Sequence, residues 1–223
     1  MTRDPLSTMR IALFLLLLGL CLPLQAEELY AALYFQRDEM TLRSGGADVD
    51  TRIGRFGVSI TSVYSPYLDG SLDIGHASLT QGGNPATQGM SLPGEYMGIA
   101  VRAWPLRSCY LDAWVQGDYT FLSVSGTSGG QSAEIELDEA GVSAGVVVHA
   151  GPVDMVAGVQ QASVSGDEIA SGAVTYTRSV RLEDKTTVWA GVDLLVDDRG
   201  GTIGVLFSSG GRSGIALRFA RRF

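Results

Sequence analysis

The chain has 223 residues and a formal charge of −8, because 24 acidic residues outnumber 16 lysines and arginines. This acidity argues against nucleic acid as a partner, since phosphate binding needs concentrated positive charge. Only two cysteines are present, and no spacing of His and Cys matches a metal site. No glycine-rich phosphate loop lies between a strand and a helix. We therefore expect no nucleic acid, no metal and no cofactor.

The first residues have the three-part form of a secretory signal. Arg10 precedes an apolar run over residues 11–22, and the run leads to a cleavage site after Ala26. The run is too short to cross a bilayer as a retained helix. We predict a cleaved signal peptide over residues 1–26, followed by one domain over residues 27–223.

The rest of the chain alternates apolar residues with small or polar ones. Phe56, Val58 and Ile60 share one face of an extended segment, while Gly57 and Ser59 share the other. No helical period is sustained after the signal, and no later apolar run reaches about 18 residues. The same alternation recurs over residues 68–74, 111–121, 140–148 and 188–196. The pattern predicts an all-β protein.

Either face of such strands could be the buried one. In a soluble barrel the apolar row points inward, whereas in a membrane barrel it points outward. The polar row here is mostly Gly, Ser and Ala with isolated Asp and Arg, as expected where side chains converge in a narrow lumen. Aromatic residues near the predicted strand ends fit interfacial girdles: Tyr64, Tyr67, Tyr96, Trp104, Tyr110, Tyr119 and Phe121. The membrane barrel is favoured, and a soluble periplasmic barrel that binds a small apolar ligand remains an alternative.

The last segment strengthens the membrane interpretation. Ile215, Leu217 and Phe219 alternate with small or polar residues, and the chain stops on Phe223. This ending resembles the terminal strand of bacterial outer-membrane β-barrel proteins, although no motif narrows the resemblance to one characterised family. The resemblance implies the outer membrane of a Gram-negative cell as location. It also implies that these four residues form an assembly signal for the barrel-assembly machinery, with periplasmic chaperones as further transient partners and outer-membrane lipid as surroundings.

Turn positions predict an antiparallel up-and-down barrel. Tight turns at 65–66, 105–108, 151–152 and 183–185 alternate with longer connections, listed by position as 44–51, 81–94, 126–136 and 166–172. Eleven extended segments result, which conflicts with the even strand number of bacterial barrels. We resolve this by treating residues 199–212 as a last outer loop, which predicts about ten strands, with eight or twelve possible, and an N-terminus in the periplasm.

Charged residues on the predicted inward rows form the main candidate site. They are Arg55, Asp69, Asp73, Arg102, Asp112, Asp118, Asp154, Asp193 and Arg218. Charges in a low-dielectric interior are expected to pair, so the leading interpretation is an Arg/Asp network that plugs the lumen. The alternative is a narrow acid-lined path that favours cations. These interpretations correspond to a structural role and to a small-porin role.

One candidate catalytic group remains. His76 and Ser78 lie two residues apart on one face, and Glu95 begins the next predicted strand. A Ser nucleophile, a His base and an orienting acid are what acyl transfer requires. The order resembles the outer-membrane lipid A deacylases, with Leu79 where that family has Asn. A lipid A deacylase-like hydrolase is therefore an alternative function. The second histidine, His149, is expected at the periplasmic interface. Oligomeric state is left open.

Overall fold

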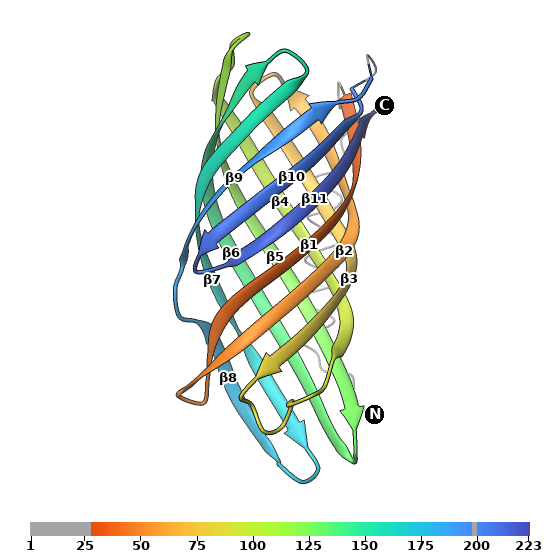
Figure 1. Cartoon of the computed structure of the whole chain (residues 1–223), viewed down its shortest axis with the longest axis vertical. Coiled ribbons are helices and arrows are strands. Elements are labelled where there is room, and N and C mark those ends of the chain that lie inside the picture. The colour runs from red at the N-terminus through yellow and green to blue at the C-terminus, as the bar shows by residue number, and fades with distance from the viewer. Residues whose placement is uncertain (1–27, 198–199) are drawn as a thin grey trace.

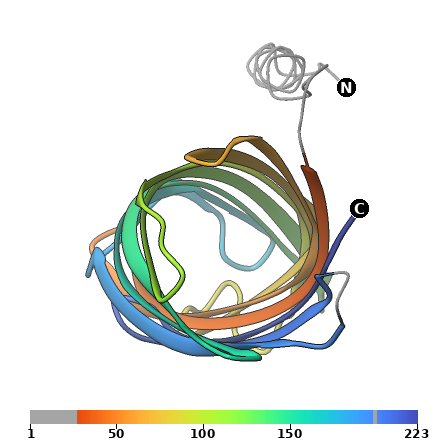
Figure 2. The ribbon, with the colours of Figure 1, turned by 90° about the horizontal axis from the view of Figure 1, so that it is seen from above.

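The computed structural model of the chain describes residues 28–197 and 200–223, so the predicted signal peptide lies outside the described residues. The described residues form β-strands, all paired antiparallel, and none forms a helix suited to crossing a membrane. The strands are β1 (Glu28–Ser44), β2 (Ala47–Ser65), β3 (Leu68–Gly82), β4 (Leu92–Leu106), β5 (Leu111–Ser128), β6 (Gln131–Ala150), β7 (Val153–Ser171), β8 (Tyr176–Leu182), β9 (Thr186–Leu195), β10 (Thr202–Gly210) and β11 (Ser213–Arg222). Because β11 pairs with β1, the wall closes into a barrel (Figures 1 and 2). The predicted all-β, up-and-down barrel is confirmed.

The number of strands around the wall changes along the barrel axis. β8 and β9 lie end to end along β7, pairing with its residues 165–170 and 153–161. The β10–β11 hairpin stops at residues 211–212, and beyond that tip β8 pairs with β1 instead. In the described chain, the half near Glu28 and Phe223 therefore has ten strands, and the opposite half has eight. We call these the proximal half and the distal half.

Two of the assignments behind the predicted strand number were wrong, although the number itself agrees with the proximal half. The predicted turn at 183–185 does not reverse the chain, because β8 and β9 continue in the same direction along β7. Residues 202–207 belong to β10, which pairs with both β9 and β11, and are not part of an outer loop. The ten strands of the proximal half agree with the predicted number. Tyr30 pairs with Arg222, so the first and last strands meet at the same end, as an even count requires.

The predicted long connections are mostly strand. β1 and β2 are joined by Gly45 and Gly46 alone, both at positive φ, where glycine is favoured. Residues 129–130 and 172–175 form similarly short connections, and only residues 83–91 make a longer loop at the distal end. The segments that suggested loops are rich in small and polar residues, yet they continue the strand pairing. Composition therefore indicated turns where the hydrogen-bonded ladder in fact persists.

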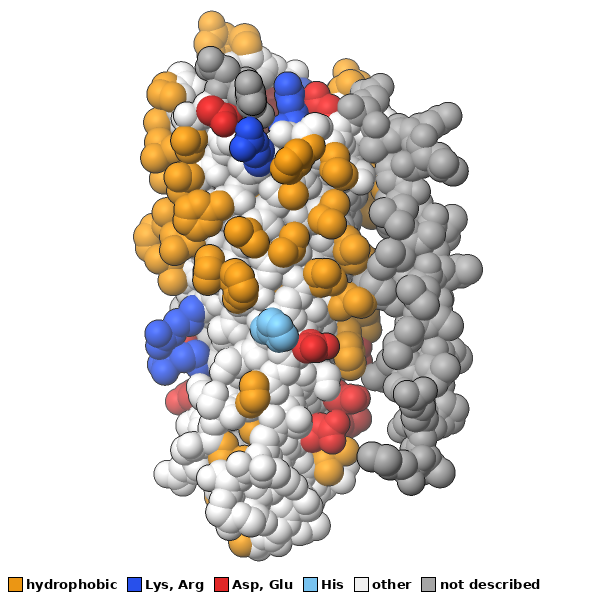
Figure 3. Space-filling model, turned by 90° about the vertical axis from the view of Figure 1, so that its right-hand side faces the viewer, with side chains coloured by type: hydrophobic (Ala, Val, Ile, Leu, Met, Phe, Trp, Pro, Cys, Tyr) orange, Lys and Arg blue, Asp and Glu red, His pale blue; other side chains and the backbone are white. Residues whose placement is uncertain are grey.

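The outer surface divides into an apolar belt and a polar distal part. The outward row of β6 stays apolar from Ala140 to Ala150, about 25 Å of membrane thickness at ~3.4 Å per residue and a tilt of ~40°. On β1 the outward row changes from Leu33 and Phe35 to the exposed pair Arg37 and Glu39. Figure 3 shows apolar side chains over the upper part of one face and mainly polar or charged groups below. In the belt, the predicted outward direction of the apolar rows is confirmed. A soluble barrel would turn these rows inward.

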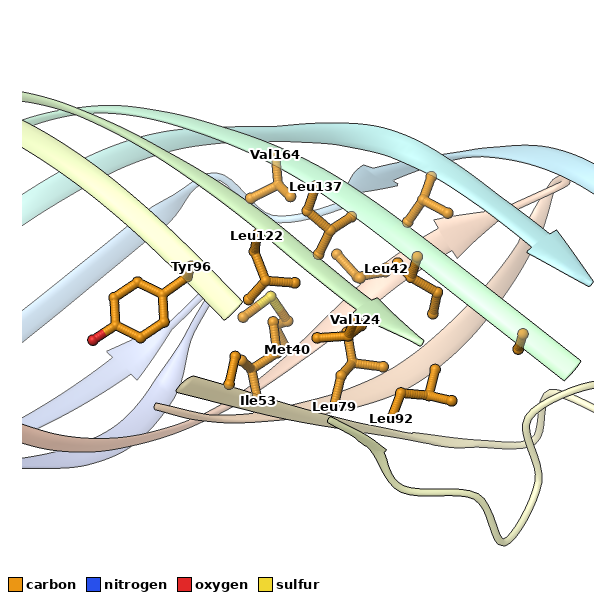
Figure 4. Close-up of a cluster of buried hydrophobic side chains, with 14 of the residues drawn as sticks. Met40, Leu42, Ile53, Leu79, Leu92, Tyr96, Leu122, Val124, Leu137 and Val164 are labelled. Atoms are coloured by element: carbon orange, nitrogen blue, oxygen red, sulfur yellow. The ribbon is translucent and has the colours of Figure 1, made fainter. Parts of the chain in front are cut away.

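Inside the distal half, the inward row is apolar. On β1 it continues as Met40 and Leu42, so the apolar residues have moved from the outward to the inward phase within one strand. A cluster from several strands, the distal core, fills this part of the barrel (Figure 4): Met40, Leu42, Ile53, Ala77, Leu79, Met90, Leu92, Tyr96, Leu122, Val124, Ala133, Ile135, Leu137, Val164, Val180 and Leu182. An eight-stranded barrel is just wide enough for side chains to fill its interior. The distal half therefore resembles a soluble barrel with a dry core.

Shortening a distal-core leucine should destabilise the barrel much more than shortening a leucine of the belt. Leu122 is fully buried, whereas Leu33 faces outward and is 47% exposed. Leu122→Ala leaves a cavity and should lower the free energy of unfolding by about 2–5 kcal/mol. Leu33→Ala loses only contact with the surrounding apolar solvent. Urea unfolding of both variants in lipid vesicles measures the difference, and equal losses would contradict a packed distal core.

Candidate functional site: the lumenal chamber

The proximal half encloses a cavity of about 500 Å³, here called the lumenal chamber. A second cavity of about 290 Å³ shares Arg102, Trp104 and Arg218 with it and extends to Glu28 and Ala220 at the proximal end. On the other side the distal core fills the barrel. The chamber is therefore blind, with its mouth beside the first and last strands.

All three tryptophans of the chain line the chamber. The rings of Trp114 and Trp189 stack with centroids 5.5 Å apart and an interplanar angle of 16°. The Arg102 guanidinium lies 4.7 Å from the Trp114 centroid and 5.4 Å from that of Trp104. Such alternation of cations and aromatic faces is electrostatically favourable. Trp104 and the buried Tyr96 thus point inward, so placing these two in interfacial girdles was wrong.

Two facing glycines make room for the stacked rings. Gly145 on β6 pairs with Gly158 on β7. A Cβ on Gly145 would come within 2.8 Å of Trp114 Cζ2, and one on Gly158 within 2.4 Å of Trp189 Cζ2. Both are closer than real Cβ contacts allow, so alanine at either position would push a ring out of place. The two glycines on the inward rows therefore leave the space that the two tryptophan rings occupy.

The charged residues predicted to line the lumen all lie on the inward face, but only one pair among them forms a direct ion pair. Arg218 Nη2 lies 2.6 Å from Asp193 Oδ2. Arg102 instead donates to Gln116 Oε1, and Trp104 Nε1 donates to Asp69 Oδ2. The other positions, by their inward register or direct contacts, are Arg55, Asp73, Asp112, Asp118 and Asp154. The prediction that these charges pair with one another therefore holds for one pair. In most of the other contacts, the partner of the charged residue is a residue that was not predicted.

His149 also faces the lumen. Its Nδ1 lies 2.8 Å from Asp154 Oδ1, and its Nε2 lies 3.4 Å from Asp112 Oδ2. It lines the lumenal chamber near the mouth, where it joins the carboxylates of β5 and β7. Its predicted place near the proximal rim agrees with its position at the end of β6, although the side chain points inward.

A buried charge cluster separates the chamber from the distal core. Arg55 Nη2 lies 2.6 Å from Glu139 Oε1, Arg212 Nη1 lies 3.1 Å from Glu139 Oε2, and Arg55 Nη1 lies 3.8 Å from Asp38 Oδ2. Each of these four residues, here called the charge cluster, is at most 9% exposed. Burial by itself would raise the pKa of Glu139, but the guanidinium groups of Arg212 and Arg55 outweigh it and lower that pKa. Burial raises the pKa of Asp38, against the opposing effect of Arg55.

The charge cluster lies where the wall changes from ten strands to eight. Arg212 occupies the tip of the β10–β11 hairpin, and its backbone N–H donates to Thr187 Oγ1. From there its side chain reaches Glu139 on β6. The sequence patterns missed this contact because Arg212 was assigned to a loop and Glu139 was not among the predicted lumen charges. The inward phase of Glu139, opposite Ala140, was the one usable indication.

The distal end is closed by a second polar network. Glu168 is fully buried and accepts hydrogen bonds from Ser44 Oγ at 2.7 Å, Asn84 Nδ2 at 2.6 Å and Tyr176 OH at 2.7 Å. Burial and the hydrogen bond to Glu168 raise the pKa of Tyr176 to about 12. Because Asn84 belongs to the loop over residues 83–91, Glu168 holds that loop across the distal opening.

The candidate catalytic residues lie on the outer face, at the edge of the apolar belt. His76 and Glu95 are cross-strand partners on β3 and β4. Ser78 Oγ lies 2.9 Å from Ser91 Oγ. Within the described ranges no hydrogen bond joins His76 to Ser78 or to Glu95. The structure thus brings the histidine beside the acid but does not assemble a linked triad.

The last strand has the predicted orientation. Ile215, Leu217 and Phe219 face outward, and the backbone N–H of Phe223 donates to Leu29 O at 2.8 Å. Gly214, Ala216 and Arg218 are on the inward side. The role of the outward residues as an assembly signal remains a prediction.

Glu139→Gln should expose how much the charge cluster depends on its shared carboxylate. Leaving two buried guanidinium groups without it should cost about 3–5 kcal/mol of unfolding free energy near neutral pH. The pKa of Glu139 is lowered in the folded state, so its contribution is present above the unfolded value of 4.5 and is lost as pH falls through the folded value. The difference between wild type and variant should therefore shrink in acid. The exposed Glu134→Gln is the matched control, and a pH-independent difference would refute this account.

The similarity of this chain to known proteins is limited to the barrel fold. No protein-family model and no curated protein matches the chain. Similar solved structures include the outer membrane protease OmpT from Escherichia coli (8% identity, TM-score 0.49, 90% of this chain and 96% of that one) and the translocator domain of the autotransporter NalP from Neisseria meningitidis (12%, 0.49, 97% and 95%). The outer membrane protein OprG from Pseudomonas aeruginosa is also similar (9%, 0.43, 89% and 97%). The closed antiparallel wall, the apolar outer belt and the charged lumen give this chain the architecture of a membrane-spanning antiparallel β-barrel.

Proposed function

We propose that the protein is a non-conducting barrel of the outer membrane with a structural role, whose lumen is closed by the distal core and the charge cluster. The outward apolar belt supports insertion in a lipid bilayer, because only a closed barrel satisfies every backbone group of its strands there. With the first and last strands at the periplasmic side, the polar distal half projects outside the cell.

The single observation that carries this proposal is the apolar constriction of the eight-stranded half. Leu42, Ile53 and Leu79 are fully buried on adjacent strands, and further fully buried leucines face them from β5 and β6. An ion needs a polar or hydrated path, and an apolar constriction excludes water from it. This closure differs from the expected Arg/Asp plug, since apolar packing provides most of it and the charge cluster adds a second layer.

The purified protein should therefore be silent in planar bilayers. Vesicles from the same preparation should show the heat-dependent electrophoretic shift of a folded barrel, which establishes that silence does not come from failed insertion. Asp118→Asn is the informative variant, because Asp118 faces the lumen inside the belt. Discrete conductance steps that change with Asp118→Asn would indicate an open acidic path and a small-porin role, and the proposed closure would be abandoned.

Hydrolysis of acyl chains at the outer surface is a second candidate, which one observation favours. A depression of about 400 Å³ lies beside His76 and Ser78, with Phe35, Phe56 and Leu217 on its apolar side. The rings of Phe35 and Phe56 stack with centroids 4.6 Å apart. Lipid acyl chains would meet this depression where the apolar belt ends, next to the imidazole and the hydroxyl.

Ser78→Ala tests this candidate against a control that the structure supplies. A hydrolase should lose its activity on lipid A when the Ser78 hydroxyl is removed, because that oxygen is the nucleophile. Ser91→Ala removes the same Ser–Ser hydrogen bond without touching the nucleophile and should retain activity. Mass spectrometry of lipid A from cells that express each form is the measurement. Identical lipid A with wild type, variant and empty vector would eliminate the hydrolase candidate.

A further inference from the structure

We propose that the lumenal chamber is a binding site for a small organic anion, with its anionic group at Arg212 and an apolar or aromatic body beside Trp189. The site opens toward the proximal end and does not depend on whether the distal half conducts. It is a function beyond the structural role. Arg212 belongs to the charge cluster, whereas Trp189 and the other apolar lining residues take no part in the closure.

The first argument is a set of guanidinium donors without protein acceptors. Arg212 is 7% exposed and lines the chamber, yet of its three guanidinium nitrogens only Nη1 has a hydrogen-bond partner among the described residues. Its Nε and Nη2 are buried without an acceptor in the described chain. A buried donor left unsatisfied is costly, and costlier when it carries charge. The blind end of the chamber thus presents donors suited to a carboxylate-type group.

The ion pairs of the cluster favour an anion over a neutral acceptor at Arg212. Arg55 and Arg212 face Glu139 and Asp38, and no other acid lies within ion-pair distance of either arginine among the described residues. Asp38 lies within that distance of Arg55 alone, so Arg212 has only the carboxylate of Glu139, which it shares with Arg55. A ligand anion would add hydrogen bonds to an ionised group, and such bonds are about twice as strong as neutral ones.

The second argument is the layering of the chamber wall. Around Arg212 the lining is small and polar, including Ser143, Thr187 and Ser208. The next inward positions toward the mouth are mainly apolar: Trp189, Leu206 and Ala216 line the chamber there, and Trp114 stacks on Trp189. An anionic head at Arg212 therefore places the remainder of a ligand against apolar surface, including an indole ring. A cavity of about 500 Å³ is within the range of small-molecule sites.

The mouth of the chamber is polar, which suits entry from water. Arg218, Asp193 and Arg102 lie beyond the apolar layer, on the side of the first and last strands. A ligand passes these groups, loses its hydration against the tryptophans and meets the unsatisfied donors at the blind end. Because the distal core blocks any exit, the chamber would hold the ligand rather than conduct it.

The folded protein in detergent micelles allows a direct test with benzoate as the probe and benzyl alcohol as its neutral counterpart. All three tryptophans line the chamber, so intrinsic fluorescence reports occupancy without a label. Benzoate should change the fluorescence saturably. Benzyl alcohol should bind roughly tenfold more weakly or worse, because it lacks the charged hydrogen bonds.

Two variants and one control separate this site from surface effects. Arg212→Gln should weaken benzoate at least about tenfold. Since that variant could fail to fold, Ala216→Phe fills the apolar layer while leaving the charge cluster intact and should abolish binding. Arg37→Gln removes the same charge from the outer surface, where Arg37 is exposed, and should bind as wild type does. Each form is first shown to be folded by its heat-dependent shift.

The outcomes are decisive in both directions. A saturable response that is lost in Ala216→Phe and kept in Arg37→Gln supports the site. No saturable response to benzoate would mean that water alone serves the buried donors, and this overturns the proposal. Equal responses to benzoate and benzyl alcohol, or an unchanged response in Ala216→Phe, overturn it as well. None of these results depends on the conductance of the barrel.

Discussion

The step from ten strands to eight at the tip of the β10–β11 hairpin is the constraint on which the rest of the structure depends. Past that tip β8 closes the wall against β1, and the narrower interior can be filled by side chains alone. Before it, the wider wall leaves the lumenal chamber. Closure at one end and open volume at the other therefore follow from the length of a single hairpin.

The charge cluster lies at this step for a physical reason. The β10–β11 hairpin ends within the wall, so the side chains at its tip face either the lumen or the outside. Arg212 turns inward to Glu139. Two guanidinium groups on one buried carboxylate are expensive to desolvate, so their net contribution to stability is small. Their directional contacts can instead specify where β11 stops along β1. The Arg212 donors without an acceptor then follow from contacts that fix the position of the hairpin tip, and they are the donors on which the proposed anion site depends.

The same strands pass through two different surroundings, lipid in the belt and water in the distal half. In the belt the outward row meets lipid and the inward row meets charge and aromatic stacks, whereas in the distal half the apolar row has changed sides. On β1 the change occurs between Phe35 and Met40, with the polar residues Gln36, Arg37 and Asp38 between the two phases. A strand can thus serve a membrane barrel and a soluble barrel in succession. This accounts for strands as long as β6, with 20 residues where about 10 would cross a membrane.

Strict alternation in the sequence was enough to predict the all-β barrel, the outward face of rows such as Ile215, Leu217 and Phe219, and the inward placement of the lumen charges, because side-chain direction in a strand depends only on local period. Tertiary structure decided what period alone does not encode. It joined β8 to β9 along β7, turned Trp104 inward, and brought Arg212 to Glu139 across 73 residues of chain. Pairing partners and wall circumference are set by contacts between strands distant in sequence, so the closed distal core and the blind chamber emerged only when the barrel was complete.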